Sequence, residues 1–225
     1  MKKITILLVL LTATASFSQG LYAELGKVDS SFEFTNSDGE MLENLQHTTQ
    51  NYVEAGYQRR IFTDGLNIGL GLSYNSYGAT GSDESQNNYF EWDVDYLGIV
   101  LSLDYAVFNI DKLAFHLKAT SSVEFLVQGT QKINNQVINL INVEEFDNKA
   151  IFFRGGAGLS YPLSDTVGLY AQYLYGQSLP MKDNRNASSN EELTIITHMI
   201  GIGIRIKLPE KQPVEMEEET EETED

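Results

Sequence analysis

The stretch LAFHLKATSSVEFLVQ, residues 113–128, decides the fold of this chain. Seven of its eight odd positions are apolar, whereas its even positions carry polar side chains such as His116, Lys118 and Glu124. A helix would scatter this pattern around its axis, but a strand sorts it onto two faces. The stretch therefore predicts a β-strand with one apolar and one polar face.

The same alternation of period two recurs along the chain and predicts eight strands. They lie near residues 20–35, 49–62, 66–78, 89–108, 113–130, 149–161, 167–178 and 191–208. Three connections are short turns, at 63–65, 109–112 and 162–166, and they alternate with four long polar connections. In an up-and-down barrel every second connection lies at the same end. This order therefore predicts an all-β, eight-stranded antiparallel barrel with short turns at one rim and long loops at the other.

Apparent phase slips interrupt the alternation in two strands. In the first strand Leu21, Ala23 and Leu25 are odd, but Val28 and Phe32 are even. The fourth strand changes in the same way between residues 94 and 97. Two explanations stay open: β-bulges, or strand ends that rise above the membrane, where lipid no longer dictates which face is apolar.

Composition excludes several classes of function. The 225 residues include 15 Lys and Arg against 32 Asp and Glu, a formal net charge of −17, and no Cys. Binding to nucleic acid requires clustered basic residues, so no nucleic-acid partner is expected. Disulfides, thiolate metal sites and a Cys nucleophile are excluded.

The chain divides into three segments. Residues 1–18 combine Lys2 and Lys3 with a short apolar run and small residues, which is typical of a cleaved signal peptide for export. Residues 19–208 form the predicted barrel. Residues 209–225 contain nine acidic residues and one Lys, and they are expected to be a disordered tail in the periplasm.

Alternation alone does not say which face points outward, because a soluble lipocalin-like barrel that binds an apolar ligand has its apolar side inside. Three features favour a transmembrane barrel. Glycines gather on the polar face, as a crowded barrel interior requires. The apolar stripes at 66–74, 97–107 and 196–208 are about as long as the ~9–11 residues of a membrane-crossing strand. Aromatic side chains lie toward both ends of the strands, as two interfacial girdles would.

Repeated Gly-x-Gly strands, such as Gly69-Leu70-Gly71 and Gly156-Ala157-Gly158, and the last strand at 199–208 carry a family resemblance. With them the chain resembles the small outer-membrane β-barrels of Gram-negative bacteria, of the OmpA/OmpX type or PorT-like. The resemblance implies an outer-membrane location, short periplasmic turns, long extracellular loops, and insertion by the barrel-insertion machinery through the last strand.

The inward face of so narrow a barrel is expected to hold a structural network of ion pairs, with a gated polar path as the alternative. The members of this predicted network are Glu24, Glu54, Arg60, Asp104, His116, Lys118, Glu124, Arg154 and Arg205. Counting from the turns predicts three pairs: Asp104 with Lys118, Glu24 with Arg205, and Glu54 with Arg154.

No catalytic, cofactor-binding or metal-binding residue is assigned, and no enzyme activity is expected. The alternative of a lipid-modifying enzyme depends on His47 with Asp38, Glu40 or Glu43. Asp83, Glu84, Glu91, Asp93 and Asp95 are expected to be a solvated acidic rim, with Ca²⁺ binding as the alternative. The sequence thus predicts a monomeric barrel with a structural or surface-interaction role. Its expected partners are outer-membrane lipid and lipopolysaccharide, the insertion machinery, and an extracellular ligand at the long loops.

Overall fold

The computed structural model describes residues 19–35, 45–62, 65–83, 88–134, 136–141, 149–182 and 192–209. The predicted signal peptide and nearly all of the acidic tail lie outside these residues, as do large parts of the long connections. The strands are β1 (Gln19–Thr35), β2 (Gln46–Arg60), β3 (Leu66–Asp83), β4 (Asn88–Ile110), β5 (Leu113–Ile133), β6 (Gln136–Asn139), β7 (Ala150–Pro162), β8 (Val167–Ser178), β9 (Met181–Lys182) and β10 (Glu192–Lys207).

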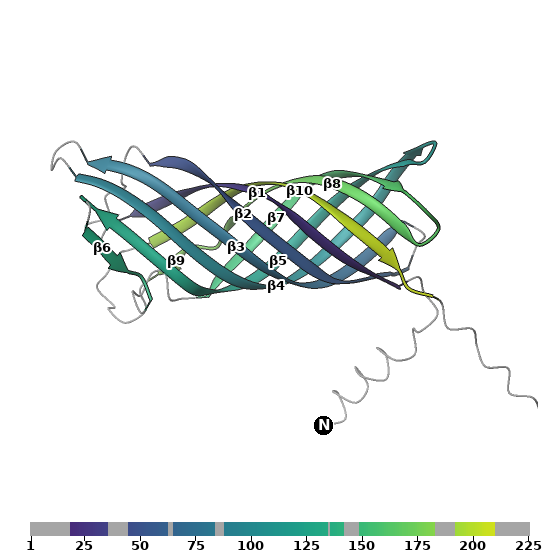
Figure 1. Cartoon of the computed structure of the whole chain (residues 1–225), viewed down its shortest axis with the longest axis horizontal. Helices are drawn as coiled ribbons and strands as arrows, with labels where there is room; N and C mark the ends of the chain where they lie inside the picture. Colours follow the sequence, from purple (N-terminus) through teal and green to yellow (C-terminus); the bar gives the residue numbers. More distant parts are fainter. Residues whose placement is uncertain are drawn as a thin grey trace, which may run out of the picture.

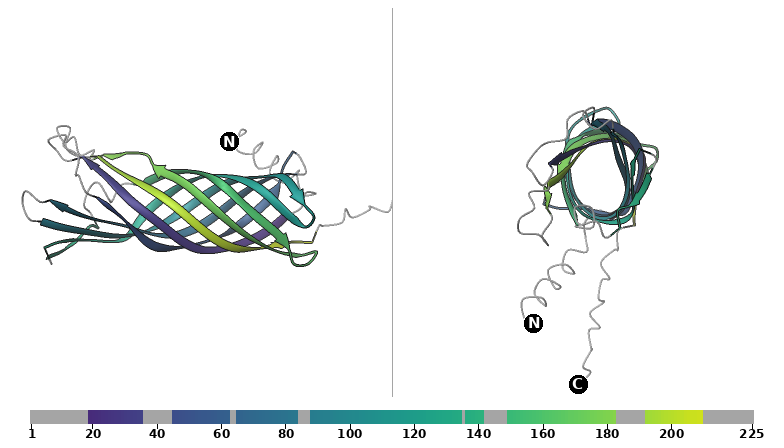
Figure 2. Two further views of the ribbon diagram at one scale, coloured as in Figure 1. Left: turned by 90° about the horizontal axis from the view of Figure 1, so that it is seen from above. Right: turned by 90° about the vertical axis from the view of Figure 1, so that its left-hand side faces the viewer.

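Eight of these strands close into an antiparallel ring in the order β1-β2-β3-β4-β5-β7-β8-β10 (Figures 1 and 2). The ring closes between β1 and β10, whose pairing runs without interruption from Gly20 and Lys207 to Thr35 and Glu192. β6 pairs with the end of β5, and β9 pairs with the start of β10. The predicted eight-stranded up-and-down barrel is therefore confirmed, and its strand positions agree with the alternation in the sequence.

The short turns lie at one end of the barrel. The same end holds the start of β1 and the end of β10 (Figure 1). Asp111 and Lys112 connect β4 to β5, and Asp111 has a φ of 54°, in the left-handed region that such two-residue hairpins require. We refer to this end as the short-turn end and to the opposite one as the long-loop end.

The apolar face of the barrel points outward over its lower and middle part. Leu72 and Ile202 are 60% and 61% exposed on this face, whereas inward neighbours such as Ser102 and Asp104 are buried. Water would oppose so much exposed apolar surface, but a lipid bilayer favours it, so the chain is a transmembrane β-barrel. The soluble lipocalin-like alternative is wrong, because it requires the opposite sidedness. Among the described residues, no helix is long and apolar enough to cross a membrane.

Toward the long-loop end the polarity of the two faces reverses. In β1 the even residues stay inward throughout, yet they change from Glu24 to the fully buried Val28 and to Phe32, while Lys27 and Asp29 point outward. The apparent phase slip in β1 is therefore no bulge but a change of environment, with water outside and an apolar filling inside. In the β4–β5 pair a bulge at Val127 of β5 accompanies the same change.

At the long-loop end β3, β4 and β5 continue with β6 as a four-stranded sheet, whose inward residues nearest the ring, such as Tyr77 and Trp92, still face the interior of the barrel. β3 and β4 pair as far as Asp83 and Asn88, β5 pairs with β4 on its other side, and β6 pairs with the end of β5 (Figure 1). We call this part, formed by residues 76–83, 88–95, 128–133 and 136–139, the sheet extension.

Candidate functional site

The lumen of the barrel holds the polar residues that the sequence points to. They come from every second position of the ring strands, because the side chains of a strand alternate between its two faces. Three clusters follow one another from the long-loop end to the short-turn end.

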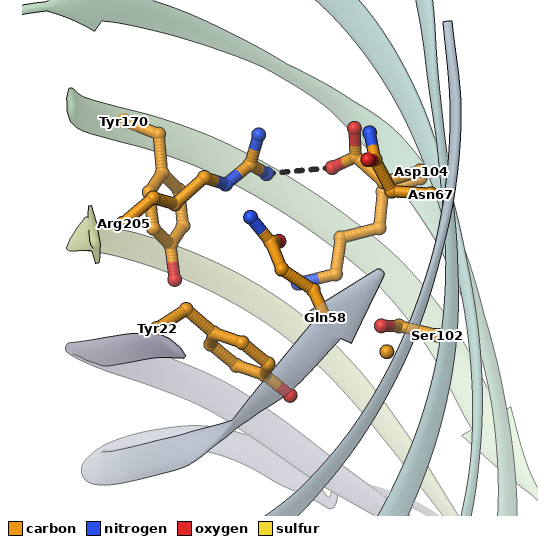
Figure 3. A pocket seen from close by; sticks show the side chains of 9 residues that line it. Tyr22, Gln58, Asn67, Ser102, Asp104, Tyr170 and Arg205 are labelled. Atoms are coloured by element: carbon orange, nitrogen blue, oxygen red, sulfur yellow. Dashed lines mark hydrogen bonds and ion pairs between the residues drawn. The ribbon is translucent and has the colours of Figure 1, made fainter. Parts of the chain in front are cut away.

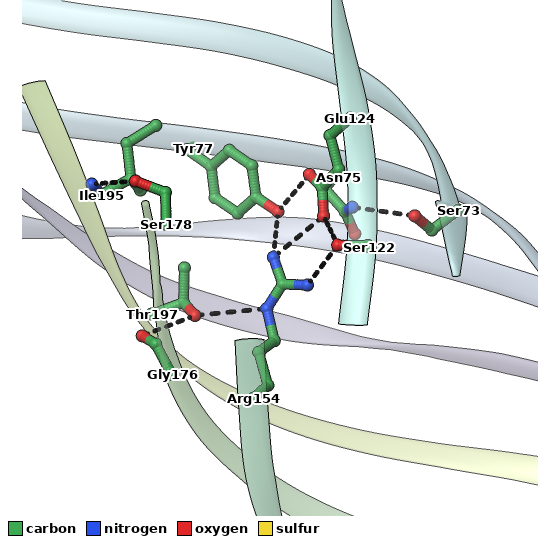
Figure 4. Close-up of polar contacts among 10 residues, drawn as sticks. All are labelled: Ser73, Asn75, Tyr77, Ser122, Glu124, Arg154, Gly176, Ser178, Ile195 and Thr197. Atoms are coloured by element: carbon green, nitrogen blue, oxygen red, sulfur yellow. Dashed lines mark hydrogen bonds and ion pairs between the residues drawn. The ribbon is translucent and has the colours of Figure 1, made fainter. Parts of the chain in front are cut away.

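The upper cluster is centred on Arg154 of β7 (Figure 4). Its guanidinium forms an ion pair of 3.0 Å with Glu124 and donates hydrogen bonds to the Tyr77 hydroxyl at 2.7 Å and to Ser122 Oγ at 3.0 Å. Glu124 in turn accepts hydrogen bonds from Tyr77 at 2.7 Å and from Ser122 at 2.6 Å. Arg154 is 6% exposed and Glu124 is completely buried. Every charge in this cluster is thus paired and hydrogen-bonded, as burial in a narrow lumen requires.

An apolar core fills the lumen around and above this cluster. The Arg154 guanidinium stacks on the Phe152 ring at 4.1 Å, and Phe152 stacks on Tyr77 with the ring centroids 5.3 Å apart. The buried members of the core are Val28, Phe32, Tyr52, Tyr77, Ala79, Trp92, Val94, Tyr96, Leu140, Ala150, Phe152, Leu174, Met181, Leu193, Ile195 and Met199. Aromatic and aliphatic side chains therefore pack together on the long-loop side of the ion pair.

The middle cluster contains two carboxylates that face each other across β1 and β2. Glu24 and Glu54 are register partners. The hydrogen bonds cross, because Tyr22 donates to Glu54 at 2.8 Å while Tyr52 donates to Glu24. The Gln172 amide also donates to both oxygens of Glu24, at 2.8 Å each. Hydroxyl and amide donors, rather than a direct ion pair, thus satisfy this acidic pair.

The lower cluster surrounds Asp104 of β4. Its carboxylate accepts a hydrogen bond from Arg205 at 2.7 Å and lies 2.9 Å from His116 Nδ1. The cluster borders a cavity of about 10 Å³ that Tyr22, Gln58, Lys118 and Tyr170 also line (Figure 3). Such a volume is roughly one water molecule and leaves no room for a larger ligand.

The three pairings predicted from the sequence are wrong in detail. Arg205 pairs with Asp104 rather than with Glu24, and Arg154 pairs with Glu124 rather than with Glu54. Asp104 and Lys118 are register partners, but the Asp104 carboxylate is held by Arg205 and His116.

Two members of the predicted network take other positions. Lys118 packs over the Tyr22 ring at 5.7 Å. Arg60 is half-buried at the short-turn end of β2, and its register partner Asn67 is also the register partner of Asp104. The buried members of the predicted network thus lie on the inward face, but with other partners than the sequence suggests.

Inward glycines make room for these clusters. A Cβ on Gly201 would collide with the Tyr52 hydroxyl and with Glu24, and a Cβ on Gly176 would collide with the Phe153 carbonyl and lie 2.6 Å from Arg154 Cα. The glycines thus let large side chains and neighbouring backbone approach one another inside the barrel.

His47, on which the enzyme alternative depends, lies on the outer face. Its Nδ1 is 3.5 Å from Asp29 Oδ2, and its ring centroid is 6.2 Å from that of His198. The Thr49 hydroxyl beside it donates to Asp29 at 3.3 Å rather than to His47. The predicted partners Asp38, Glu40 and Glu43 lie outside the described residues.

The acidic side chains of the sheet extension are spread along β4. Glu91 pairs with Lys132 at 2.8 Å, and Asp95 accepts a hydrogen bond from Ser76 at 2.5 Å. Partial burial, and then the charges of Asp95 and Glu91, raise the pKa of Asp93 above its usual value. In the described part of the chain, no three His, Cys, Asp or Glu side chains are placed to hold a metal ion. Glu84 lies outside the described residues, and so does the side chain of Asp83.

Comparisons with known proteins give structural similarity without sequence kinship. No family model and no curated protein matches the chain. Neisserial surface protein A has 15% identity and a TM-score of 0.49, over 84% of this chain and 97% of its own. The outer membrane protein OprG from Pseudomonas aeruginosa has 13% identity and a TM-score of 0.47, over 86% of this chain and 97% of its own. The attachment invasion locus protein Ail of Yersinia pestis has 12% identity and a TM-score of 0.39, over 83% and 98%. Similarity at this level says nothing about function.

Proposed function

We propose that this protein is an outer-membrane barrel with a closed lumen, acting as a structural or surface-interaction protein rather than as a pore. The observation that supports the proposal is the packing of side chains in the lumen. The Arg154 network crosses it, and the apolar core around Tyr77 and Phe152 lies on the long-loop side. An eight-stranded barrel is just wide enough for its own side chains, and here these side chains are packed and paired.

The sheet extension supports a role at the cell surface. In the proposed orientation the short turns face the periplasm, so the sheet extension projects outward from the membrane. Tyr89, Val137 and Ile138 are 51%, 63% and 40% exposed on or beside it. Exposed aromatic and aliphatic side chains on a rigid sheet suit contact with an extracellular partner. Insertion through β10, contact with lipopolysaccharide, a monomeric state and a periplasmic acidic tail belong to the same proposal.

Conductance across a planar lipid bilayer tests the closed lumen. We expect the reconstituted wild-type protein to give no steady conductance above that of the bare bilayer. A variant with Tyr77→Ser and Phe152→Ser, which removes two large rings from the lumen, should conduct if it folds. Steady conductance of the wild type would refute the closed lumen.

A lipid-modifying enzyme is the second candidate, favoured by the Asp29–His47 pair on the outer face. An imidazole held by a carboxylate is a general base in many hydrolases. The measurement is release of labelled fatty acid when the protein is incubated with labelled phospholipid in detergent. Turnover that His47→Ala abolishes would establish the enzyme, and we expect none.

A further inference from the structure

The outer face of β1, β2 and β10 changes from apolar to polar at one common level. On β1 the change falls between Leu25 and Lys27, and on β2 between Val53 and Asn51. On β10 the first polar outward side chain is His198, beside Ile200, and Ile196 follows it. Lys27 is the register partner of both Asn51 and Ile200, so the three changes lie side by side. The boundary between hydrocarbon and headgroups crosses the barrel here.

A hollow lies at this boundary. It has a volume of about 430 Å³ and is lined by Lys27, Asp29, Thr49, His198 and Ile200. Lys27 Nζ donates to Asn51 Oδ1 at 2.7 Å, which holds the ammonium on the outer face. Asp29 is occupied by His47 and Thr49. The Lys27 ammonium is therefore positioned by Asn51 but is not neutralised by an ion pair with Asp29.

Two tyrosines of β8 hold His198 beside the hollow. The Tyr173 hydroxyl lies 2.8 Å from His198 Nδ1, and the Tyr175 ring packs against the imidazole with the centroids 4.9 Å apart. When a hydroxyl donates to Nδ1 of a neutral imidazole, the proton of the ring is on Nε2. With that tautomer the hollow combines the Lys27 ammonium with an imidazole N–H, two donors that suit the oxygens of a phosphate group, while the Asp29 carboxylate in the same lining is held by His47 and Thr49.

An apolar groove of about 620 Å³ begins directly below the hollow. On β1 the outward side chains Leu25 and Ala23 follow Lys27, and on β10 Ile202 and Ile204 follow Ile200. The small side chains of Ala23 and Ala171 deepen the groove between larger neighbours. A chain of methylene groups fits such a groove, and in the hydrocarbon of the bilayer it is held there by van der Waals packing.

We propose that this face binds one phosphate-bearing lipid of the outer leaflet, with its phosphate between Lys27 and His198 and an acyl chain in the groove over Ala23. The donors, the groove and the level of the membrane boundary all fit the same amphiphile. This inference rests on the proposed membrane orientation. It is independent of the closed lumen, because the site lies on the outer face.

Native mass spectrometry of the full-length protein purified in detergent tests the site. The probes are dioleoyl phosphatidic acid and dioleoylglycerol, which share their acyl chains and differ in the phosphate. We expect one phosphatidic acid per barrel, bound about tenfold more tightly than dioleoylglycerol, because charge-assisted hydrogen bonds hold the phosphate. Lys27→Met and His198→Phe should each lower the affinity about fivefold or more.

Lys132→Met is the matched control, because it removes an exposed lysine far from the hollow and should leave lipid binding unchanged. Migration on gels with and without boiling confirms that each variant is folded. Equal binding of both lipids, or unchanged binding in Lys27→Met, would overturn the phosphate site. Displacement of the lipid by millimolar inorganic phosphate alone would overturn the lipid as its occupant. Conductance of the wild type would refute the closed lumen and leave this result intact.

Discussion

Replacing Arg154 with methionine should destabilise the barrel strongly, because the substitution removes the only cation that contacts Glu124 among the described residues. Glu124 is completely buried and would keep only the hydrogen bonds from Tyr77 and Ser122. Removing one partner of a buried ion pair costs about 3–5 kcal/mol, since the other charge is left uncompensated. With a urea dependence of about 1–3 kcal/mol per molar, the unfolding midpoint should fall by about 1 M or more.

The single tryptophan of the chain reports this unfolding. Trp92 is 6% exposed in the apolar core, with ring centroids 6.1 Å from Phe32 and 5.6 Å from Phe90. Its fluorescence, followed during reversible urea unfolding in detergent micelles, gives the free energy of unfolding. The double variant Arg154→Met, Glu124→Met should regain about half of the loss or more, because no unpaired charge remains in the lumen.

An exposed ion pair of similar length provides the control. Lys132 and Glu91 are 2.8 Å apart on the sheet extension, and Lys132→Met should leave the midpoint unchanged within error. If Arg154→Met behaves like Lys132→Met, or if the Arg154 and Glu124 substitutions add up independently, the argument for a coupled buried network is refuted.

Three further predictions concern packing, pH and depth in the membrane. Gly156→Val should prevent folding, because a Cβ at this position would collide with the Tyr173 carbonyl oxygen. Gly155→Val should be tolerated, because a Cβ at that position meets no atom within 4 Å. Gel migration without boiling distinguishes folded from unfolded protein, and equal behaviour of the two variants would contradict the described packing. Because the pKa of Asp93 is raised in the folded protein, the folded sheet extension binds the carboxyl proton of Asp93 more tightly than the unfolded chain does. The stability of the sheet extension should therefore fall as the pH rises from about 4 through the raised pKa. Hydrogen exchange of the backbone amides in residues 88–95, corrected for intrinsic rates, should therefore be slower at low pH than at pH 7. Asp93→Asn should abolish this pH dependence of the exchange rate, and a pH dependence that persists in the variant would exclude Asp93 as its cause. Brominated lipids should leave the fluorescence of Trp92 unchanged but quench a Tyr105→Trp probe in a Trp92→Phe background, and strong quenching of Trp92 would place the apolar core at membrane depth.

The strands and their two faces were predictable from the sequence, because period-two alternation is local. The stripe at 113–128 is β5, and its even residues His116, Lys118 and Glu124 are inward as predicted. The level at which the polarity reverses was visible only as an apparent phase slip at Val28 and Phe32. The phase slip could be interpreted only from the closed barrel, because the uninterrupted pairing of β1 with β10 shows that the same residues of β1 face inward along the whole strand.

The ion partners were not predictable in the same way. Arg205 and Glu24 lie on neighbouring strands, but the register places Arg205 opposite Tyr22 and Glu24 opposite Gly203. Long side chains then reach across the lumen, as Arg205 does to Asp104 on β4. The choice of ion-pair partners thus depends on the stagger between neighbouring strands and on the diameter of the barrel. Neither can be derived from the alternation of apolar and polar residues in a single strand.

The reversal of polarity on β1, β2 and β10 fixes how deeply the barrel sits in the membrane. A strand rises about 3.3 Å per residue and is tilted by about 35–45° from the membrane normal, so a shift by one outward position moves the protein by about 5 Å. Such a shift inward would draw Lys27 and Asp29 into hydrocarbon, and the opposite shift would expose Leu25 and Ile202 to water. Both displacements are unfavourable, so the outward residues of these three neighbouring strands set the vertical position of the whole molecule.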